Sequence, residues 1–368
     1  MSRGGIVGAA AVPHAPQFFT LPDTEDHEQV ARVERTMRGI GEDLRELDPD
    51  AVVIIANDHL QNFLLHCVPS FTIHRGPKVS GSFAGHDFSW PVASDIATGI
   101  VRQVQRQGFD PAVSLSAPIG YEFGIPLTFL GFGQDTPLIP IYVNSYVPPQ
   151  PTGDRCYAFG RALATAAELL DVRLCVIASG GLSHYPGTEK YASPDLHTDE
   201  YILQHMRAGN LRVLLEFDDS ALDRTGNVEA RSWLILAGAL AERIPGIVRL
   251  EPSWHHNYAI AGWSDRTGPV QDAPHYPVPR ADQLALYEAL YALRNSHDAC
   301  VGFLRDPEGF AGRYDLRPAE RAAIVRLDEA ALRDLGVHPL LAFLARLEVN
   351  LARSASPPAG VTPQRPRA

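Results

Sequence analysis

The chain of 368 residues has few cysteines and no CxxC pair among them. Cys67, Cys156, Cys175 and Cys300 are widely spaced, which disfavours structural disulfides and zinc sites built from thiolates. Cys175 lies inside an apolar stretch, where a free thiol behaves as a small hydrophobic side chain. This cysteine usage predicts a reducing, cytoplasmic environment.

The chain also lacks an excess of positive charge and long apolar runs. Its formal net charge is −11, whereas binding to nucleic acid phosphates or anionic lipids requires clustered lysine and arginine. No stretch approaches the roughly 20 apolar residues of a membrane span. The short run after Arg3 resembles a signal-peptide core, but Pro13 and His14 follow where a cleavage site should be. We therefore expect no nucleic-acid partner, no membrane association and no signal peptide.

What the chain does contain is typical of a globular α/β protein. Hydrophobic residues make up 45% of it and charged residues 20%, which suffices for a large core. Strand-like and helix-like stretches alternate along the first 278 residues, which predicts a mixed central sheet with helices on both faces. Strands are expected at 4–13, 51–56, 126–133, 137–146 and 173–179. Helices are expected at 24–47, 94–108, 156–170, 195–217 and 227–243, and an irregular segment at 64–91.

The composition changes at residues 268–282, which hold four prolines and little apolar periodicity. This segment predicts a linker between an α/β domain, 1–278, and a small all-helical domain, 283–352. Within the second domain, helices are expected at 282–295, 299–305, 317–332 and 338–352. The polar, proline-rich end, 353–368, is expected to be disordered.

Three apolar runs each end, within a few residues, in a histidine. The histidines are His14 in VPHAP, His59 in ANDH and His184 in SGGLSH. Because ligands of open α/β sheets bind just beyond the carboxyl ends of the strands, three imidazoles at one sheet edge predict a metal site with a proton-transfer group beside it.

A carboxylate completes a possible ligand set. Glu229 lies two residues after Asn227, a natural helix N-cap, so it could simply be a first-turn carboxylate that the helix dipole favours. A lone strand-end histidine is likewise often structural. Two imidazoles and one carboxylate nevertheless form the facial triad of non-haem Fe(II) oxygenases, although zinc or manganese would accept the same ligands.

The four motifs VPHAP, ANDH, SGGLSH and NVEARSW, in this order, resemble those of LigB-type (class III) extradiol ring-cleaving dioxygenases. The C-terminal segment, with FLRDPEGF and LRPAERAAIVRLD, is similar to the small helical LigA-type subunit. The chain thus resembles a fusion of the two, as in gallate dioxygenases, and is similar to gallate and protocatechuate 4,5-dioxygenases.

The resemblance implies a role for each matching residue. His14, His59 and Glu229 match the Fe(II) ligands, and His184 matches the acid/base histidine of the active site. In SWHHNYAIAGW, three residues fall where the family contacts substrate, or else are structural: His256, Asn257 and Tyr258.

One position departs from the family pattern. The family has a second histidine in a DHG motif, whereas this chain reads IGYEFGIPLTF and places Tyr121 there. A tyrosine, with an ordinary pKa of about 10, donates a hydrogen bond but transfers protons poorly near neutral pH. Tyr121 could hold a ring substituent, change the proton route, mark an impaired enzyme or only fill space.

The resemblance implies an Fe(II)-dependent enzyme that inserts both atoms of O₂ into a dihydroxylated aromatic or heteroaromatic ring. Gallate-like or protocatechuate-like acids, substituted catechols and dihydroxypyridines are all candidate substrates. We also expect a homodimer or higher oligomer, with the helical domain covering the pocket. A zinc hydrolase on a related sheet and an inactive LigB-like binding protein are the alternatives.

Overall fold

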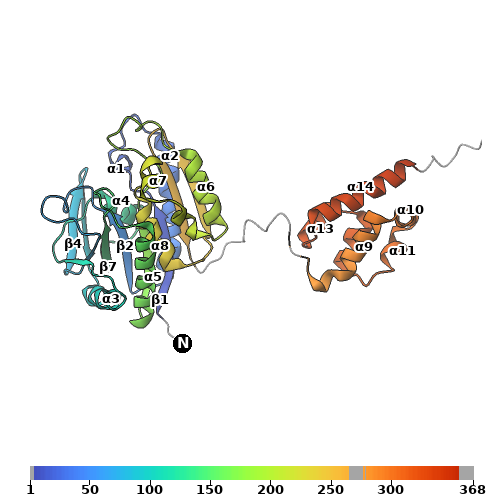
Figure 1. Cartoon of the computed structure of the whole chain (residues 1–368), viewed down its shortest axis with the longest axis horizontal. Helices are drawn as coiled ribbons and strands as arrows, with labels where there is room; N and C mark the ends of the chain where they lie inside the picture. The colour runs from blue at the N-terminus through green and yellow to red at the C-terminus, as the bar shows by residue number, and fades with distance from the viewer. Residues whose placement is uncertain (1–3, 265–276, 278, 356–368) are drawn as a thin grey trace, which may run out of the picture. The chain divides into compact units, whose positions relative to one another are not determined.

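The computed structural model describes residues 4–264, 277 and 279–355. Contacts between residues divide the chain into two compact units, 1–270 and 271–368 (Figure 1). Among the described residues, no helix is both long and apolar enough to span a membrane. Cys67 is exposed, whereas Cys156, Cys175 and Cys300 are buried.

The first unit is built on an eight-stranded mixed sheet in the order β6-β3-β7-β2-β8-β1-β10-β9. Its central strands β7, β2, β8 and β1 are parallel, while β3, β10 and β9 introduce antiparallel pairs. The strands are β1 (Gly5–Val12), β2 (Ala51–Asn57), β3 (Phe71–His74), β6 (Ala112–Ser114), β7 (Leu138–Val143), β8 (Arg173–Ser179), β9 (Ile247–Pro252) and β10 (Asn257–Trp263). This arrangement confirms the predicted mixed α/β fold.

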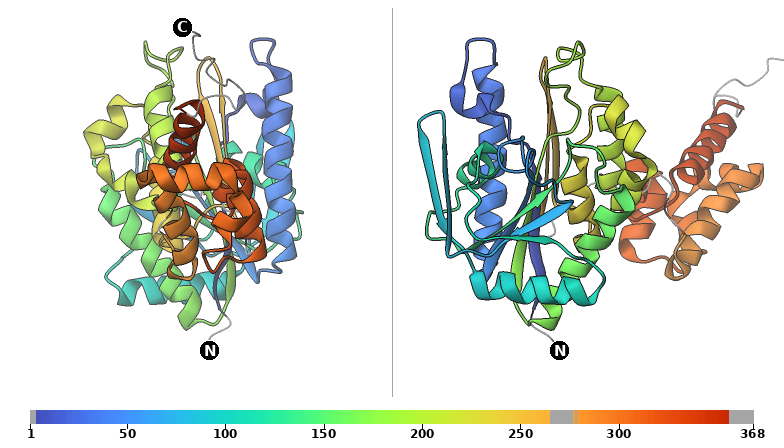
Figure 2. Two further views of the ribbon diagram at one scale, coloured as in Figure 1. Left: turned by 90° about the vertical axis from the view of Figure 1, so that its right-hand side faces the viewer. Right: turned by 60° about the vertical axis from the view of Figure 1, so that its left-hand side comes forward.

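Helices cover both faces of this sheet, and each face has its own apolar core (Figure 2). One face packs against α3, α5 and α8, and the other against α2 and α4. The helices of the unit are α1 (Gln17–Thr20), α2 (His27–Glu46), α3 (Ser94–Arg106), α4 (Tyr121–Phe129), α5 (Gly153–Leu169), α6 (Leu196–Arg207), α7 (Asp219–Arg224) and α8 (Ala230–Leu240), with a 3₁₀ helix at Leu211–Glu216. Because β2 is buried along its whole length, it reads as a continuous apolar run.

Several predicted elements were wrong. Residues 126–133 do not form a strand: helix α4 starts at Tyr121 and is buried on nearly all sides, so it lacks the polar face that marks a surface helix. The segment 64–91 is not irregular, because it contains β3 and the hairpin of β4 (Lys78–Phe83) and β5 (His86–Pro91). Strands β9 and β10 were not predicted. Helix α2 begins at His27 rather than at the predicted residue 24, after the N-cap Asp26, whose side chain accepts two backbone hydrogen bonds.

The second unit is all-helical, as predicted, with its own apolar core. Its helices are α9 (Leu284–Asn295), α10 (His297–Arg305), α11 (Pro307–Ala311), α12 (Pro318–Arg326), α13 (Glu329–Asp334) and α14 (Pro339–Ala355), preceded by a 3₁₀ turn at Ala281–Gln283. Helix α14 continues to residue 355 and so includes the first three residues of the predicted tail. The rest of the tail, 356–368, and most of the predicted linker lie outside the described residues.

Candidate metal centre

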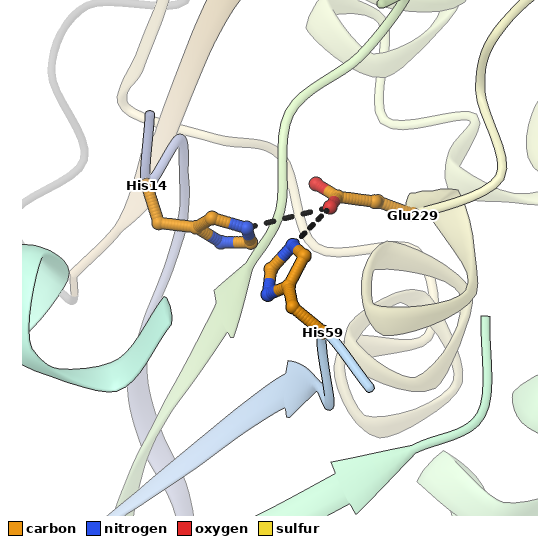
Figure 3. A group of neighbouring side chains, drawn as sticks. All are labelled: His14, His59 and Glu229. Atoms are coloured by element: carbon orange, nitrogen blue, oxygen red, sulfur yellow. Dashed lines mark hydrogen bonds and ion pairs between the residues drawn. The ribbon is translucent and has the colours of Figure 1, made fainter. Parts of the chain in front are cut away.

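The predicted site residues come from four separate elements and meet at one edge of the sheet. His14 lies two residues beyond β1, His59 two residues beyond β2, and His184 follows β8. Glu229 is the N-cap of α8. One ligand atom each of His14, His59 and Glu229 lies within 4.8 Å of the other two (Figure 3). The fold thus brings together residues that are up to 215 positions apart in sequence, from position 14 to position 229.

A single carboxylate oxygen is the centre of this cluster. Glu229 Oε1 lies 3.4 Å from His14 Nε2, 3.3 Å from His59 Nε2 and 3.6 Å from His184 Nε2. The other oxygen, Oε2, accepts a hydrogen bond of 2.8 Å from the backbone N–H of Gly181. The glycine therefore fixes the carboxylate with Oε1 toward the imidazoles.

Hydrogen bonds on the far side of each ring determine which nitrogen faces the cluster. Ser179 Oγ donates to the backbone carbonyl of Glu122 at 2.5 Å, so it accepts at 2.8 Å from His14 Nδ1–H. In the same way, the carbonyl of Leu182 accepts from His184 Nδ1–H at 2.8 Å. In both rings Nε2 is left with a free lone pair that points toward the cluster.

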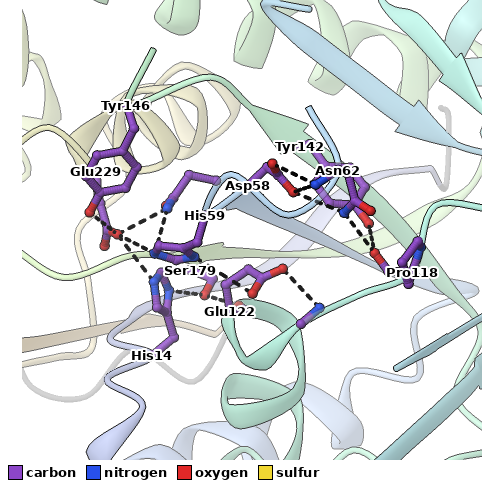
Figure 4. Close-up of polar contacts among 12 residues, drawn as sticks. His14, Asp58, His59, Asn62, Pro118, Glu122, Tyr142, Tyr146, Ser179 and Glu229 are labelled. Carbon is purple, nitrogen blue, oxygen red and sulfur yellow. Dashed lines mark hydrogen bonds and ion pairs between the residues drawn. The ribbon is translucent and has the colours of Figure 1, made fainter. Parts of the chain in front are cut away.

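A second buried carboxylate lies behind His59. Glu122 Oε2 is 3.8 Å from His59 Nδ1, and Glu122 Oε1 accepts from the N–H of Gly120 at 3.0 Å (Figure 4). Both Glu122 Oε2 and His59 Nδ1 are buried without a hydrogen-bond partner among the described residues. Carboxylates in this position orient metal-binding histidines and make them more basic.

The carboxylates and imidazoles shift one another's pKa. Burial lowers the pKa of His59, but Glu122 and Glu229 outweigh burial and raise this pKa to about 9. Burial also opposes ionisation of Glu229, yet His14 and His184 hold its pKa well below the ordinary value. For His184, the attraction of Glu229 exceeds the effect of burial and raises the pKa.

These features fit a divalent cation. Nε2 of His14 and Nε2 of His59 lie 3.4 and 3.3 Å from one carboxylate oxygen, an arrangement that is unfavourable unless a proton or a cation lies between these atoms. Nitrogen and oxygen donors of this kind suit iron, zinc or manganese. His14, His59 and Glu229 are therefore the residues that could hold a metal ion, and His184 stands beside them.

Two further residues contact the cluster and were not predicted. Tyr146 donates a hydrogen bond of 2.8 Å to Glu229 Oε1 and lies 3.3 Å from His184 Nε2, while Asn57 Nδ2 donates to Glu229 Oε1 at 3.1 Å. Tyr146 follows β7 just as the histidines follow their strands. The strand-end rule applied to β7 could therefore have found it.

A cavity of about 100 Å³ opens at the cluster. It is lined by His14, Ala15, Pro16, Gln17, His59, Tyr121, Tyr146, His184, Pro186, Tyr191, Glu229, His255 and His256. Because the metal-ligand candidates form part of its wall, a small molecule bound there would lie directly beside them.

Tyr121 lies on this cavity wall at the start of α4. Its ring stacks on His59 with centroids 4.9 Å apart, and burial, together with Glu229 and Glu122, raises the pKa of its hydroxyl above the ordinary value. The hydroxyl is therefore protonated near neutral pH and can donate a hydrogen bond. It remains a poor proton acceptor there.

Of the three residues predicted to contact substrate, only His256 lines the cavity. Its ring stacks on His184 with centroids 4.2 Å apart, and burial and His184 hold its pKa well below the ordinary value. The Asn257 side chain instead donates to buried Asp199 at 2.8 Å, and the Tyr258 hydroxyl donates to Glu25 at 3.3 Å. Since these partners hold both side chains away from the cavity, the geometry does not favour substrate contacts for Asn257 and Tyr258.

The chain is similar to one protein family over most of the first unit. Residues 8–264 match the family described as the catalytic LigB subunit of aromatic ring-opening dioxygenase. This match contains all four cluster residues.

Curated proteins with similar sequences carry a related name. The 2,3-dihydroxyphenylpropionate/2,3-dihydroxicinnamic acid 1,2-dioxygenase of Klebsiella pneumoniae subsp. pneumoniae is 31% identical over 193 residues, which cover 52% of this chain and 62% of that protein. The protein of the same name from Escherichia coli K12 is 31% identical over 163 residues, covering 44% of this chain and 52% of its own length. The chain thus spans little more than half the length of each of these relatives.

The crystal structure of uncharacterized protein JW3007 from Escherichia coli K12 matches with a TM-score of 0.47 and 15% identity, covering 69% of this chain and 99% of that chain.

Proposed function

Because the chain belongs to the LigB family of aromatic ring-opening dioxygenases, we propose that it is an Fe(II)-dependent extradiol dioxygenase. The substrate would be a dihydroxylated aromatic or heteroaromatic ring, opened beside its two hydroxyl groups. The observation that carries the proposal is the convergence of His14, His59 and Glu229 on one cavity wall, with the His184 imidazole 3.6 Å from the shared carboxylate oxygen.

His14, His59 and Glu229 would hold the iron through Nε2, Nε2 and Oε1. Bound there, Fe(II) would supply open positions at which a diol and O₂ meet in fixed orientation. Two hydrogen bonds would hold these ligands in place. Ser179 Oγ accepts from His14 Nδ1–H, and the Gly181 N–H donates to Glu229 Oε2. Such contacts typically change metal affinity by about 10- to 100-fold.

His184 would act as the proton carrier. The carbonyl of Leu182 holds its Nδ1–H, so Nε2 is the atom that accepts a proton from a substrate hydroxyl and later returns it. Stacking on His256 keeps the ring in place, and the low pKa of His256 keeps that neighbour uncharged. Tyr121, which also lines the cavity, would donate a hydrogen bond to the substrate.

The names of the curated relatives suggest a first substrate to try, 2,3-dihydroxyphenylpropionate. Gallate, protocatechuate, substituted catechols and dihydroxypyridines extend the set. The similarity of the second unit to LigA-type subunits, the homo-oligomer and the cytoplasmic location also remain predictions. Light scattering on the full chain measures the oligomeric state.

The proposal is tested by anaerobic reconstitution of the full chain with Fe(II), followed by oxygen-electrode assays with each diol. We expect iron-dependent O₂ uptake and a yellow ring-opened product from at least one diol. Glu229→Ala should abolish both iron binding and uptake, whereas Glu216→Ala, at the end of the 3₁₀ helix Leu211–Glu216, should change neither. Tight zinc binding without oxygen uptake on any diol would instead favour the hydrolase alternative.

A further inference from the structure

The cavity has a second polar wall that the ligand cluster does not use. This wall is made of Gln17, Tyr191 and His255, all of which line the cavity. The Tyr191 ring stacks on His255 with centroids 5.3 Å apart, and Gln17 Nε2 donates to the Tyr191 hydroxyl at 3.2 Å. These three side chains therefore form one connected group, here called the outer subsite.

A buried carboxylate holds the outer subsite from behind. The Glu25 side chain is 1% exposed, and its Oε1 lies 3.1 Å from His255 Nε2 and 3.2 Å from Trp254 Nε1. Because the carboxylate only accepts, Nε2 of His255 carries the hydrogen and Nδ1 remains for a ligand. Burial lowers the pKa of His255 despite Glu25, so the ring is neutral and Nδ1 is an acceptor.

A second acceptor belongs to Gln17. The amide nitrogen of Gln17 donates to the Tyr191 hydroxyl, which leaves Oε1 as the acceptor of this side chain. Oε1 is buried and has no hydrogen-bond partner among the described residues. A buried oxygen without a donor is unfavourable, so a bound molecule that supplies a donor would gain affinity from this contact.

We propose that the outer subsite binds the ring substituent of the diol and selects a substituent that donates hydrogen bonds, such as an amino or hydroxyl group, over a carboxylate. This inference rests on the proposed function for the position of the ring. Two acceptors, Gln17 Oε1 and His255 Nδ1, would receive the donor hydrogens. The Glu25 carboxylate lies 3.1 Å from His255 Nε2, and its negative charge disfavours an anionic substituent beside His255.

The test measures binding by anaerobic calorimetry on the Fe(II)-loaded full chain, without O₂ and hence without turnover. The ligands are two matched pairs, 2,3-dihydroxybenzylamine with 2,3-dihydroxybenzoate, and the 3,4-dihydroxy isomers of both. We expect the amine to bind about tenfold more tightly than the carboxylate in at least one pair, since hydrogen bonds to charged groups contribute about 1.5–3 kcal/mol.

Variants then locate the origin of this preference. Glu25→Gln removes the charge but keeps the shape, so it should strengthen carboxylate binding and reduce the amine-to-carboxylate ratio about three- to tenfold. His255→Ala removes one acceptor and should weaken amine binding by a similar factor. His197→Ala, on the exposed surface of α6, is the matched control and should leave the ratio unchanged.

The outcomes separate the two proposals. Amine preference without O₂ uptake on any diol would support the subsite and refute the dioxygenase function. Preferred binding of the carboxylates, or an unchanged ratio in both Glu25→Gln and His255→Ala, would overturn the subsite inference alone. Failure of every diol to bind would refute both.

Discussion

Replacing Gly181 by alanine tests how the Glu229 carboxylate is held. A Cβ at this position would lie 1.6 Å from His256 Nε2 and 2.4 Å from His256 Cε1, so the imidazole must move. That ring stacks on His184, and the N–H of Gly181 itself donates to Glu229 Oε2 at 2.8 Å. One methyl group would therefore disturb the proton carrier and a metal-ligand candidate together.

The expected size of the effect follows from these contacts. Forcing an extra methyl into a packed site costs about 1–3 kcal/mol of folding free energy. Misorientation of a ligand by loss of its supporting contact weakens metal binding about 10- to 100-fold. We therefore expect Gly181→Ala to fold with reduced stability and to bind Fe(II) at least tenfold more weakly than the unsubstituted protein.

The assay pairs urea unfolding with anaerobic equilibrium dialysis against Fe(II). Gly39→Ala is the matched control, because a Cβ there meets nothing within 4 Å and the residue lies inside α2. Alanine in a helix interior is favoured over glycine by up to about 1 kcal/mol, so this control should be slightly stabilised with unchanged iron affinity. Unchanged iron affinity in Gly181→Ala would refute the role assigned to the Gly181 contact.

Four other variants address individual roles. His14→Ala should lose stoichiometric iron, as measured by metal analysis, and full iron content would contradict its role as a ligand. His184→Gln should keep its iron but lose at least about 100-fold in turnover, a typical contribution of general acid–base catalysis, and near-normal turnover would count against proton transfer by this ring. Tyr121→Phe should raise KM about three- to tenfold with iron content unchanged, because one hydrogen bond to the substrate is lost. An unchanged KM would indicate that Tyr121 only fills space. Glu122 and Glu229 raise the pKa of His59 to about 9, and iron must displace the His59 proton, so iron affinity should rise with pH up to about 9. Glu122→Gln should lower the pH at which this rise ends. An unchanged pH profile in this variant would refute the effect of Glu122 on His59.

The sheet was predictable where burial is uniform. Strands β1, β2 and β8 are nearly all apolar, so each was recognised from its run of small or branched side chains. The β4–β5 hairpin was missed because it is a two-stranded ribbon with many exposed residues, and its pattern resembles that of a loop. Residues 126–133 were mistaken for a strand because PLTFLGFG is mostly apolar and begins with Pro126, whereas helix α4 covers the first four of these residues.

The position of the site was predictable for a topological reason, since parallel strands end at the same sheet edge. The roles of individual residues followed from family motifs. The supporting contacts of Ser179 and Glu122 could not be predicted, because both residues reach the cluster through long-range packing that leaves no local signal. Tyr146 is different, since it follows β7 and the strand-end rule could have identified it. For the same reason, the sequence could not show that Asn257 turns toward Asp199 instead of the cavity.

The most direct test of the central claim is ring opening under ¹⁸O₂ by the Fe(II)-loaded chain. With the best diol from the oxygen-electrode assays, we expect one O₂ consumed per diol and both ¹⁸O atoms in the ring-opened product, as determined by mass spectrometry. Glu229→Ala should give no product. A product containing no ¹⁸O, or oxygen uptake that yields hydrogen peroxide with the ring intact, would contradict the proposed function.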